Sequence, residues 1–317
     1  MGHQAVGMTL YWQGELRDAR EHLQQAFDLG GPLRQRLDTL PYSAVDGLVI
    51  NRAFCAYALV FLGYPDEAVR ASHDSEALAQ EIGRPSALAA RLVFASVFHQ
   101  LLGDVEVARE RAEAGIALAT EHGFYQFVVL GTLLRGCALA AGGQSEAGIT
   151  EMRGALDAMR AAGAELGRPY YSSILAEAYG TAGQPAQGLA LIEEAVGDAN
   201  RTGQRLYEAD LHRIKGELLI ADCGMRNAES GRENPQSEIR NPQSEAEDCL
   251  RHAIDCARRQ GAKHSELRAA LSLSRLWRGQ GKRADARTLL AEIYGWFTEG
   301  FETRDLKEAK ALLEELR

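Results

Sequence analysis

The sequence predicts an all-α fold built as an array of helix hairpins, closed by one further helix at its C-terminal end. Three observations support this prediction. Glycines recur every 40 residues from Gly63 to Gly183, and a second series with the same spacing, from Gly83 to Gly203, falls midway between them. The segments between glycines have apolar residues at helical spacing. Small side chains also recur at fixed distances from the first series, as expected for closely packed repeats.

Composition agrees with this fold and narrows the classes of function. Among 317 residues, only 8 prolines and 7% aromatic residues favour helices over a β-sandwich. The net charge of −9 argues against a general nucleic-acid binder. Five cysteines without paired spacing and no signal peptide predict a cytoplasmic location. The longest apolar run, Ala53 to Leu62, is too short to cross a bilayer, so we expect no membrane partner.

The individual turns have the residues that end one helix and start the next. Gly83-Arg84-Pro85 and Gly167-Arg168-Pro169 are expected to place glycine at a helix C-cap and proline in the first turn of the following helix. The first predicted helix, Gly2 to Gln13, is shorter than its equivalents and has no cap. We therefore expect Met1 to fall inside a repeat, with the N-terminus cut or joined to another segment.

The small residues follow a rule that fixes seven repeats. One precedes each turn glycine by seven positions, and another follows it by five. The first set is Gly7, Ala56, Ser96, Gly136, Ala176 and Ser274, and the second is Ala19, Ala68, Ala108, Gly148, Gly188 and Ala286; in the repeat without a turn glycine, Gly216 makes a seventh member of the first set and Ala246 stands at the place of the second. Such a pattern lets two antiparallel helices approach closely. It resembles the tetratricopeptide family, with repeats of about 40 rather than 34 residues, and this resemblance implies a right-handed α-solenoid spanning 1–317.

Two stretches interrupt the spacing. Extra residues around Gly31 to Tyr42 predict a loop or a short additional turn. The larger break contains Asn234-Pro-Gln-Ser-Glu238 and its direct repeat Asn241-Pro-Gln-Ser-Glu245, a polar composition that does not bury a core. We predict that 225–243 is a disordered low-complexity insertion between two helices of one repeat; a recognition motif is the alternative. If it is disordered, deleting 225–243 leaves the melting temperature nearly unchanged.

The C-terminal part is amphipathic and resembles a more specific group. Asp305 to Leu316 has apolar residues on one side and charges on the other, which predicts a capping helix within 303–317. The stretch Glu266 to Leu316, with Gln280-Gly-Lys-Arg-Ala-Asp-Ala, resembles the C-terminal region of bacterial predicted ATPases and adenylate or guanylate cyclase-like signalling proteins. This resemblance implies a sensor or regulatory segment. The chain has no phosphate-binding loop of its own, so we expect no catalytic residues and no cofactor.

Two further sets of residues allow a chemical interpretation. Cys249, His252 and Cys256 share one face of a predicted helix and suit zinc, but without a fourth ligand we expect them to flank the core and hold no metal. His99 occupies a position that is large and apolar in most repeats. It is either a tolerated core substitution or a buried pH-sensitive group or ligand.

Charge is unevenly distributed along the sequence. From Cys249 to Leu290 ten Lys or Arg stand against three Asp or Glu, a local charge of +7. This stretch is expected to receive an acidic partner segment, to contact another part of a longer protein, or to be a solvated basic face; nucleic acid is the weaker alternative.

The predicted function is a non-catalytic scaffold for protein interactions. In tetratricopeptide arrays the first helix of each pair lines a concave groove, which the resemblance implies is the surface that binds a protein or peptide segment, here including an ATPase or cyclase module. Carrying over the inner-face positions gives Tyr57, Gln100, Tyr170, Glu177, Arg213, Glu217, Arg275 and Arg278. The alternative is that the chain is part of an ATP-dependent adenylate cyclase or a transcriptional regulator whose catalytic or DNA-binding domain lies outside it.

Overall fold

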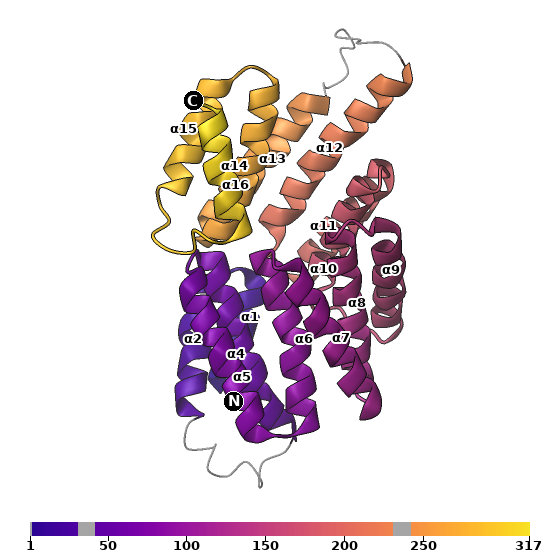
Figure 1. Ribbon diagram of the computed structural model, residues 1–317, viewed down its shortest axis with the longest axis vertical. Helices are drawn as coiled ribbons and strands as arrows, with labels where there is room; N and C mark the ends of the chain where they lie inside the picture. Colours follow the sequence, from indigo (N-terminus) through magenta and orange to yellow (C-terminus); the bar gives the residue numbers. More distant parts are fainter. Residues whose placement is uncertain (1, 31–41, 231–241) are drawn as a thin grey trace. The chain divides into compact units, whose positions relative to one another are not determined.

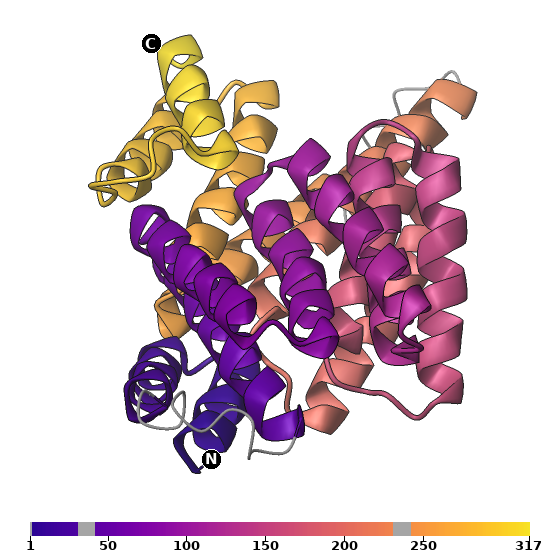
Figure 2. The same ribbon diagram turned by 60° about the horizontal axis from the view of Figure 1, so that its bottom comes forward.

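The computed structural model describes residues 2–30, 42–230 and 242–317. Within these ranges the chain forms fifteen α-helices and no strand, which confirms the predicted all-α class. The helices divide into two compact units, residues 1–165 and 166–317. Each unit is built from antiparallel hairpins of consecutive helices, and Figure 2 shows those of the first unit from indigo to magenta.

Seven hairpins and one further helix account for the described elements (Figure 1). In the first unit they are α1 (Gly2–Gln13), α2 (Leu16–Leu29), α4 (Tyr42–Leu62), α5 (Pro65–Ile82), α6 (Pro85–Leu102), α7 (Val105–Glu121), α8 (Tyr125–Ala141) and α9 (Ser145–Ala161). In the second unit they are α10 (Arg168–Thr181), α11 (Pro185–Thr202), α12 (Glu208–Ser230), α13 (Pro242–Gln260), α14 (Lys263–Gly279), α15 (Arg283–Tyr294) and α16 (Arg304–Glu315). First helices of successive hairpins also contact each other, as α4 with α6 and α10 with α12.

The turns between helices depend on glycine in the left-handed region. Both predicted series adopt it, with φ of 90° at Gly63 and 65° at Gly83 as examples. At the first of these turns the amide of Gly63 donates to the carbonyl of Val60, and that of Tyr64 to the carbonyl of Leu59. These bonds satisfy carbonyls that the helix end leaves without partners. Gly167 differs from the prediction, because it lies at the N-cap of α10 rather than at a helix C-cap.

The predicted small residues are where paired helices approach most closely. A Cβ atom added to Gly148 would lie 2.5 Å from the carbonyl oxygen of Gly136, twelve residues earlier in the facing helix. At the equivalent place in another hairpin, Ser96 Oγ donates to the carbonyl of Ala108 at 2.7 Å. Ser274 does the same to Ala286 at 3.2 Å. The small residues recurring in the sequence therefore mark the positions where the backbones of paired helices lie close together.

Each unit has its own apolar core. In the first unit Tyr11 packs edge to face against Phe54, with ring centroids 5.0 Å apart, and both are buried. In the second unit one cluster includes Leu211 and Leu218 of α12, and another includes Leu250 of α13. Each fully buried leucine contributes about 1.5–3 kcal/mol of hydrophobic free energy.

One described helix, α6, is long and apolar enough to cross a membrane by length and composition, with a mean hydropathy of 1.2. More than half of it, 61%, is buried inside the protein. Helix α6 packs against α4, α7 and α8. A helix that packs against neighbours on several sides buries most of its circumference, and this burial accounts for its apolar composition.

The second unit agrees with the sequence prediction at its C-terminal helix and differs from it between α12 and α13. Helix α16 packs against α14 and α15 through Leu306, Ala309 and Leu312, as expected of a capping helix. The expected insertion 225–243 is shorter at both ends, because α12 continues to Ser230 and α13 starts at Pro242. The rest of that insertion, and the loop predicted near residues 31–41, lie outside the described residues.

Candidate functional site

Ionisable side chains from four helices gather in the second unit. Helices α10, α12, α14 and α16 contact one another in succession, and each contributes at least one polar residue. We call the following set the polar cluster: Glu177, Asp210, Arg213, Glu217, His264, Ser265, Arg268, Ser272 and Asp305. Three of the eight predicted groove residues, Glu177, Arg213 and Glu217, belong to it.

Arg213 is the centre of the polar cluster, and only 4% of its side chain is exposed. Its Nη1 donates to both carboxylate oxygens of Glu217 at 2.9 Å and to Oε1 of Glu177 at 3.3 Å. Its Nε donates to Oδ1 of Asp210 at 3.3 Å. Residues 210, 213 and 217 share one face of α12 because they are spaced by three and four positions. One buried cation thus joins three carboxylates.

Asp210 is the most deeply buried carboxylate of the cluster. It accepts hydrogen bonds from Ser265 Oγ at 3.0 Å and from Arg268 Nη1 at 3.2 Å, both on α14. Burial by itself would raise its pKa, but the charges of Arg268 and Arg213 outweigh burial and hold the pKa of Asp210 below its usual value. Asp210 is therefore ionised at neutral pH.

The rim of the polar cluster consists of groups that solvent reaches. About a third of each side chain is exposed for Glu177 (36%), Glu217 (34%) and Arg268 (30%). The two arginines also lower the pKa of Glu177 against the opposing effect of burial. At the far side His264 Nε2 lies 3.6 Å from Asp305 Oδ2.

The polar cluster has an excess of negative charge. Burial lowers the pKa of His264 more than Asp305 raises it, so the imidazole is neutral at pH 7. Four carboxylates then face two guanidinium groups, which leaves two negative charges in excess. A partly desolvated site with this balance attracts cationic groups.

The other predicted groove residues lie elsewhere. Tyr170 stacks on Tyr207, with ring centroids 4.1 Å apart, and both rings are buried. Tyr57 and Gln100 belong to the first unit. The hydroxyl of Tyr57 donates to the carbonyl of Phe94, and Oε1 of Gln100 is buried without a hydrogen bond from the described residues.

Arg275 and Arg278 of α14 are paired with the capping helix. Arg275 Nη2 donates to Glu308 at 2.6 Å, and Arg278 donates to Glu315. Elsewhere in the basic stretch, Lys282 pairs with Glu247 at 3.2 Å. Much of the predicted basic surface is therefore neutralised by carboxylates of the same chain.

The structure agrees with the sequence interpretation for Cys249 and Cys256, places His252 differently, and gives His99 a polar partner. Cys256 is buried and Cys249 half-buried, and burial raises the pKa of both thiols. His252 instead lies edge to face with His212 of α12, with ring centroids 4.3 Å apart. His99 is half-buried and its Nδ1 lies 3.2 Å from Asp104 Oδ2, while burial lowers its pKa.

Asp210, Arg268 and Asp305 are members of the polar cluster that the sequence did not predict. A signal for Asp210 was present, since it stands three residues before Arg213 on the same helical face. Arg268 and Asp305 are each at least 58 residues from both Asp210 and Glu177 in the sequence, so no helical spacing predicts that they lie together.

Comparisons with known proteins support the fold. No protein-family model matches the chain, and no curated protein matches it. Among solved structures the chain is similar to a Rap protein complexed with Competence and Sporulation Factor, with 13% identity and a TM-score of 0.63, over 99% of this chain and 79% of that one. This likeness places the fold among helical repeat proteins.

Two weaker similarities carry no structural argument because their TM-scores are below 0.5. One is to a Signal Transduction ATPase with Numerous Domains protein with a tetratricopeptide repeat sensor from Pyrococcus horikoshii, with 16% identity and a TM-score of 0.44, over 99% of this chain and 43% of that one. The other is to a circular tandem repeat protein with novel repeat topology, with 14% identity and a TM-score of 0.28, over 99% of this chain and 82% of that one.

Proposed function

We propose that the chain is a non-catalytic scaffold that binds a peptide or an extended protein segment through the polar cluster. The observation that supports this is the partly exposed pair of carboxylates, Glu177 and Glu217, beside the buried pair of Arg213 and Asp210. Because Arg213 fixes Glu177 and Glu217, their oxygens meet a ligand with little further loss of side-chain entropy. The ligand that suits this rim has lysine or arginine side chains, or a free amino terminus.

The proposal extends to a regulatory role. The Rap neighbour is complexed with Competence and Sporulation Factor, and by analogy of fold the repeats of this chain would hold a ligand. We infer further, from the resemblance of Glu266 to Leu316, that the chain is the sensor segment of a signalling ATPase or cyclase-like protein. The genomic DNA upstream of Met1 tests this inference. An in-frame phosphate-loop or cyclase domain supports it, whereas its absence favours an autonomous adaptor.

Selection of peptides tests the binding site directly. A phage library of random dodecapeptides is selected on the purified chain, and enriched peptides are measured by calorimetry. We expect enrichment in lysine and arginine, and affinity that falls steeply with salt. The double variant Glu177→Gln/Glu217→Gln should bind at least about tenfold more weakly, the effect of losing roughly 1.4 kcal/mol.

A matched control separates the site from overall charge. The double variant Glu110→Gln/Glu113→Gln removes the same charge from exposed positions of α7 and should bind like the wild type. Equal loss in both double variants, or enriched peptides without basic residues, contradicts the proposed site.

A further inference from the structure

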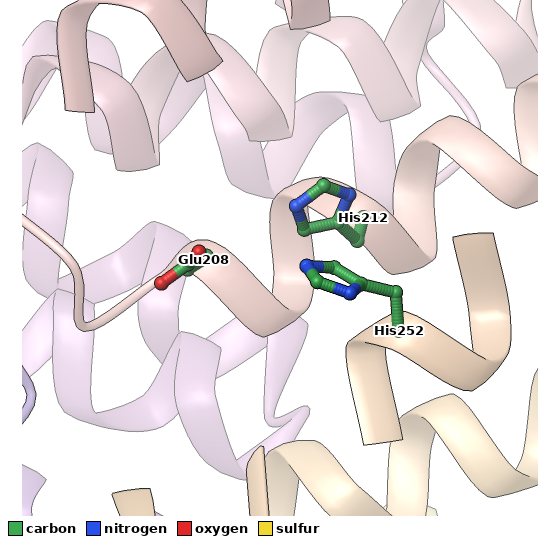
Figure 3. A group of neighbouring side chains, drawn as sticks. All are labelled: Glu208, His212 and His252. Atoms are coloured by element: carbon green, nitrogen blue, oxygen red, sulfur yellow. The ribbon is translucent and has the colours of Figure 1, made fainter. Parts of the chain in front are cut away.

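Three side chains with nitrogen or oxygen donor atoms meet between α12 and α13 (Figure 3). Glu208 and His212 are four positions apart, so they lie on one face of α12. His252 reaches them from α13, the partner helix of the same hairpin. One potential ligand atom from each of the three residues lies within 4.8 Å of the others.

The arrangement of these atoms is close to that of a metal site. The rings of His212 and His252 lie at 79° to each other, edge to face, rather than stacked. Bonds of about 2.1 Å from zinc to nitrogen and oxygen put ligand atoms of a tetrahedral site about 3.4 Å apart. Glu208 and His212 are half-buried and His252 is exposed, and their donor atoms lie within 4.8 Å of one another, so an ion would have to draw them about 1.4 Å closer at most.

Charge at this place suits a divalent cation. A neutral imidazole offers one ring nitrogen as a metal ligand, and the Glu208 carboxylate adds a negative charge. Nearby cations already have partners. The partner of Arg205 is the proposed ligand itself: its Nη1 lies 3.5 Å from a carboxylate oxygen of Glu208, so a bound ion would displace this half-exposed guanidinium. Lys215 pairs with Glu193 at 2.5 Å.

We propose that Glu208, His212 and His252 bind a divalent transition-metal ion of the zinc class, with water completing the coordination. Two imidazoles and one carboxylate form a ligand set that zinc uses in proteins. This site replaces the one considered from sequence, because Cys249 and Cys256 are protonated thiols, and Cys256 Sγ accepts a hydrogen bond from Arg259 at 3.0 Å. The ion links α12 to α13.

Cobalt and zinc titrations of the full chain test the proposal. Co²⁺ absorption reports geometry and ligand type, and Zn²⁺ calorimetry gives affinity and stoichiometry. We expect one ion per chain, no sulfur-to-cobalt charge-transfer band, and a melting temperature that rises with Zn²⁺. The variants His212→Ala, His252→Ala and Glu208→Gln should each weaken binding at least about tenfold. His73→Ala, an exposed histidine of α5, and His3→Ala should bind like the wild type.

The His3 variant is needed because His3 and His22 are also close, with Nδ1 atoms 2.8 Å apart. Circular dichroism and melting without metal show that each variant folds. A sulfur-to-cobalt band overturns the proposal in favour of the cysteines. Loss of binding in His3→Ala overturns it in favour of the first unit. Wild-type protein that does not bind Zn²⁺, or ligand variants that bind it as tightly as the wild type, also overturn the proposal.

Discussion

Replacing Arg213 by methionine tests whether the polar cluster is a structural centre as well as a candidate binding site. Of the three carboxylates that Arg213 joins, Asp210 is only 7% exposed, whereas Glu177 and Glu217 keep about a third of their surface in water. The loss therefore falls mainly on Asp210. Breaking a buried ion pair costs about 3–5 kcal/mol, and since Arg268 still bonds Asp210 at 3.2 Å we expect about 3 kcal/mol.

Urea unfolding followed by tryptophan fluorescence measures this cost in the second unit alone. A Trp12→Phe background leaves Trp277 and Trp296, which both belong to residues 166–317. Arg275→Met is the matched control. It removes an exposed pair with Glu308, for which we expect a cost below about 1 kcal/mol. Equal costs for the two variants would refute the reasoning.

Acidity provides an independent check on the same variant. The pKa values of Asp210 and Glu177 are lowered in the folded protein. Their stabilisation is complete above the unfolded pKa of about 4 and is lost as pH falls through the folded values. The difference in stability between wild type and Arg213→Met should therefore be largest at pH 7 and narrow below about pH 4. A difference that does not change with pH contradicts the assigned ion pairs.

Three further predictions concern packing, hydrogen bonding and histidine. Gly148→Ala should lower the free energy of unfolding by about 1–3 kcal/mol in thermal unfolding, because its Cβ would meet the Gly136 carbonyl. On the same helix a Cβ at Gly154 meets nothing within 4 Å, so Gly154→Ala should raise that free energy by up to about 1 kcal/mol. Similar effects of the two substitutions would contradict the close approach. Ser96→Ala should cost about 0.5–1.5 kcal/mol in urea unfolding through its lost bond to Ala108, and no cost would show that this bond contributes nothing. The pKa of His264 is lowered in the folded protein, so below the unfolded value of about 6.5 the unfolded state takes up the proton more readily and the free energy of unfolding falls. Between pH 7 and pH 5 the wild type should therefore lose stability more steeply than His264→Asn. Parallel slopes would argue against a buried neutral imidazole.

The repeat architecture was accessible from sequence because it depends on local rules. A glycine such as Gly63 is required where φ is positive, and a small residue such as Gly148 is required where a facing backbone is near, so both recur with the period of the fold. Arg213 and Glu217 stand four positions apart on one helix, and the family resemblance had assigned both to the inner face. These properties need no knowledge of which helices meet.

The parts of the site that depend on distant pairing were not accessible. Arg268 meets Asp210 only through the register of α14 against α12, and the insertion between α12 and α13 hides that register. For the same reason periodicity assigned His252 to a face with two cysteines, whereas the structure brings it to His212. Glu208 and His212 stood four residues apart in the sequence, a signal without meaning until the third side chain was placed.

The pairing of α14 with α16 has a consequence for any acidic partner. Glu308 and Glu315 are attached to the same chain as Arg275 and Arg278, so they compete for these arginines as an intramolecular ligand. Tethering to the same chain, here through α15 and its flanking turns, gives an effective concentration of up to about millimolar order. A free acidic segment with the same intrinsic affinity for the two arginines would have to reach comparable concentrations before it displaced them, unless it also gained contacts that α16 does not make.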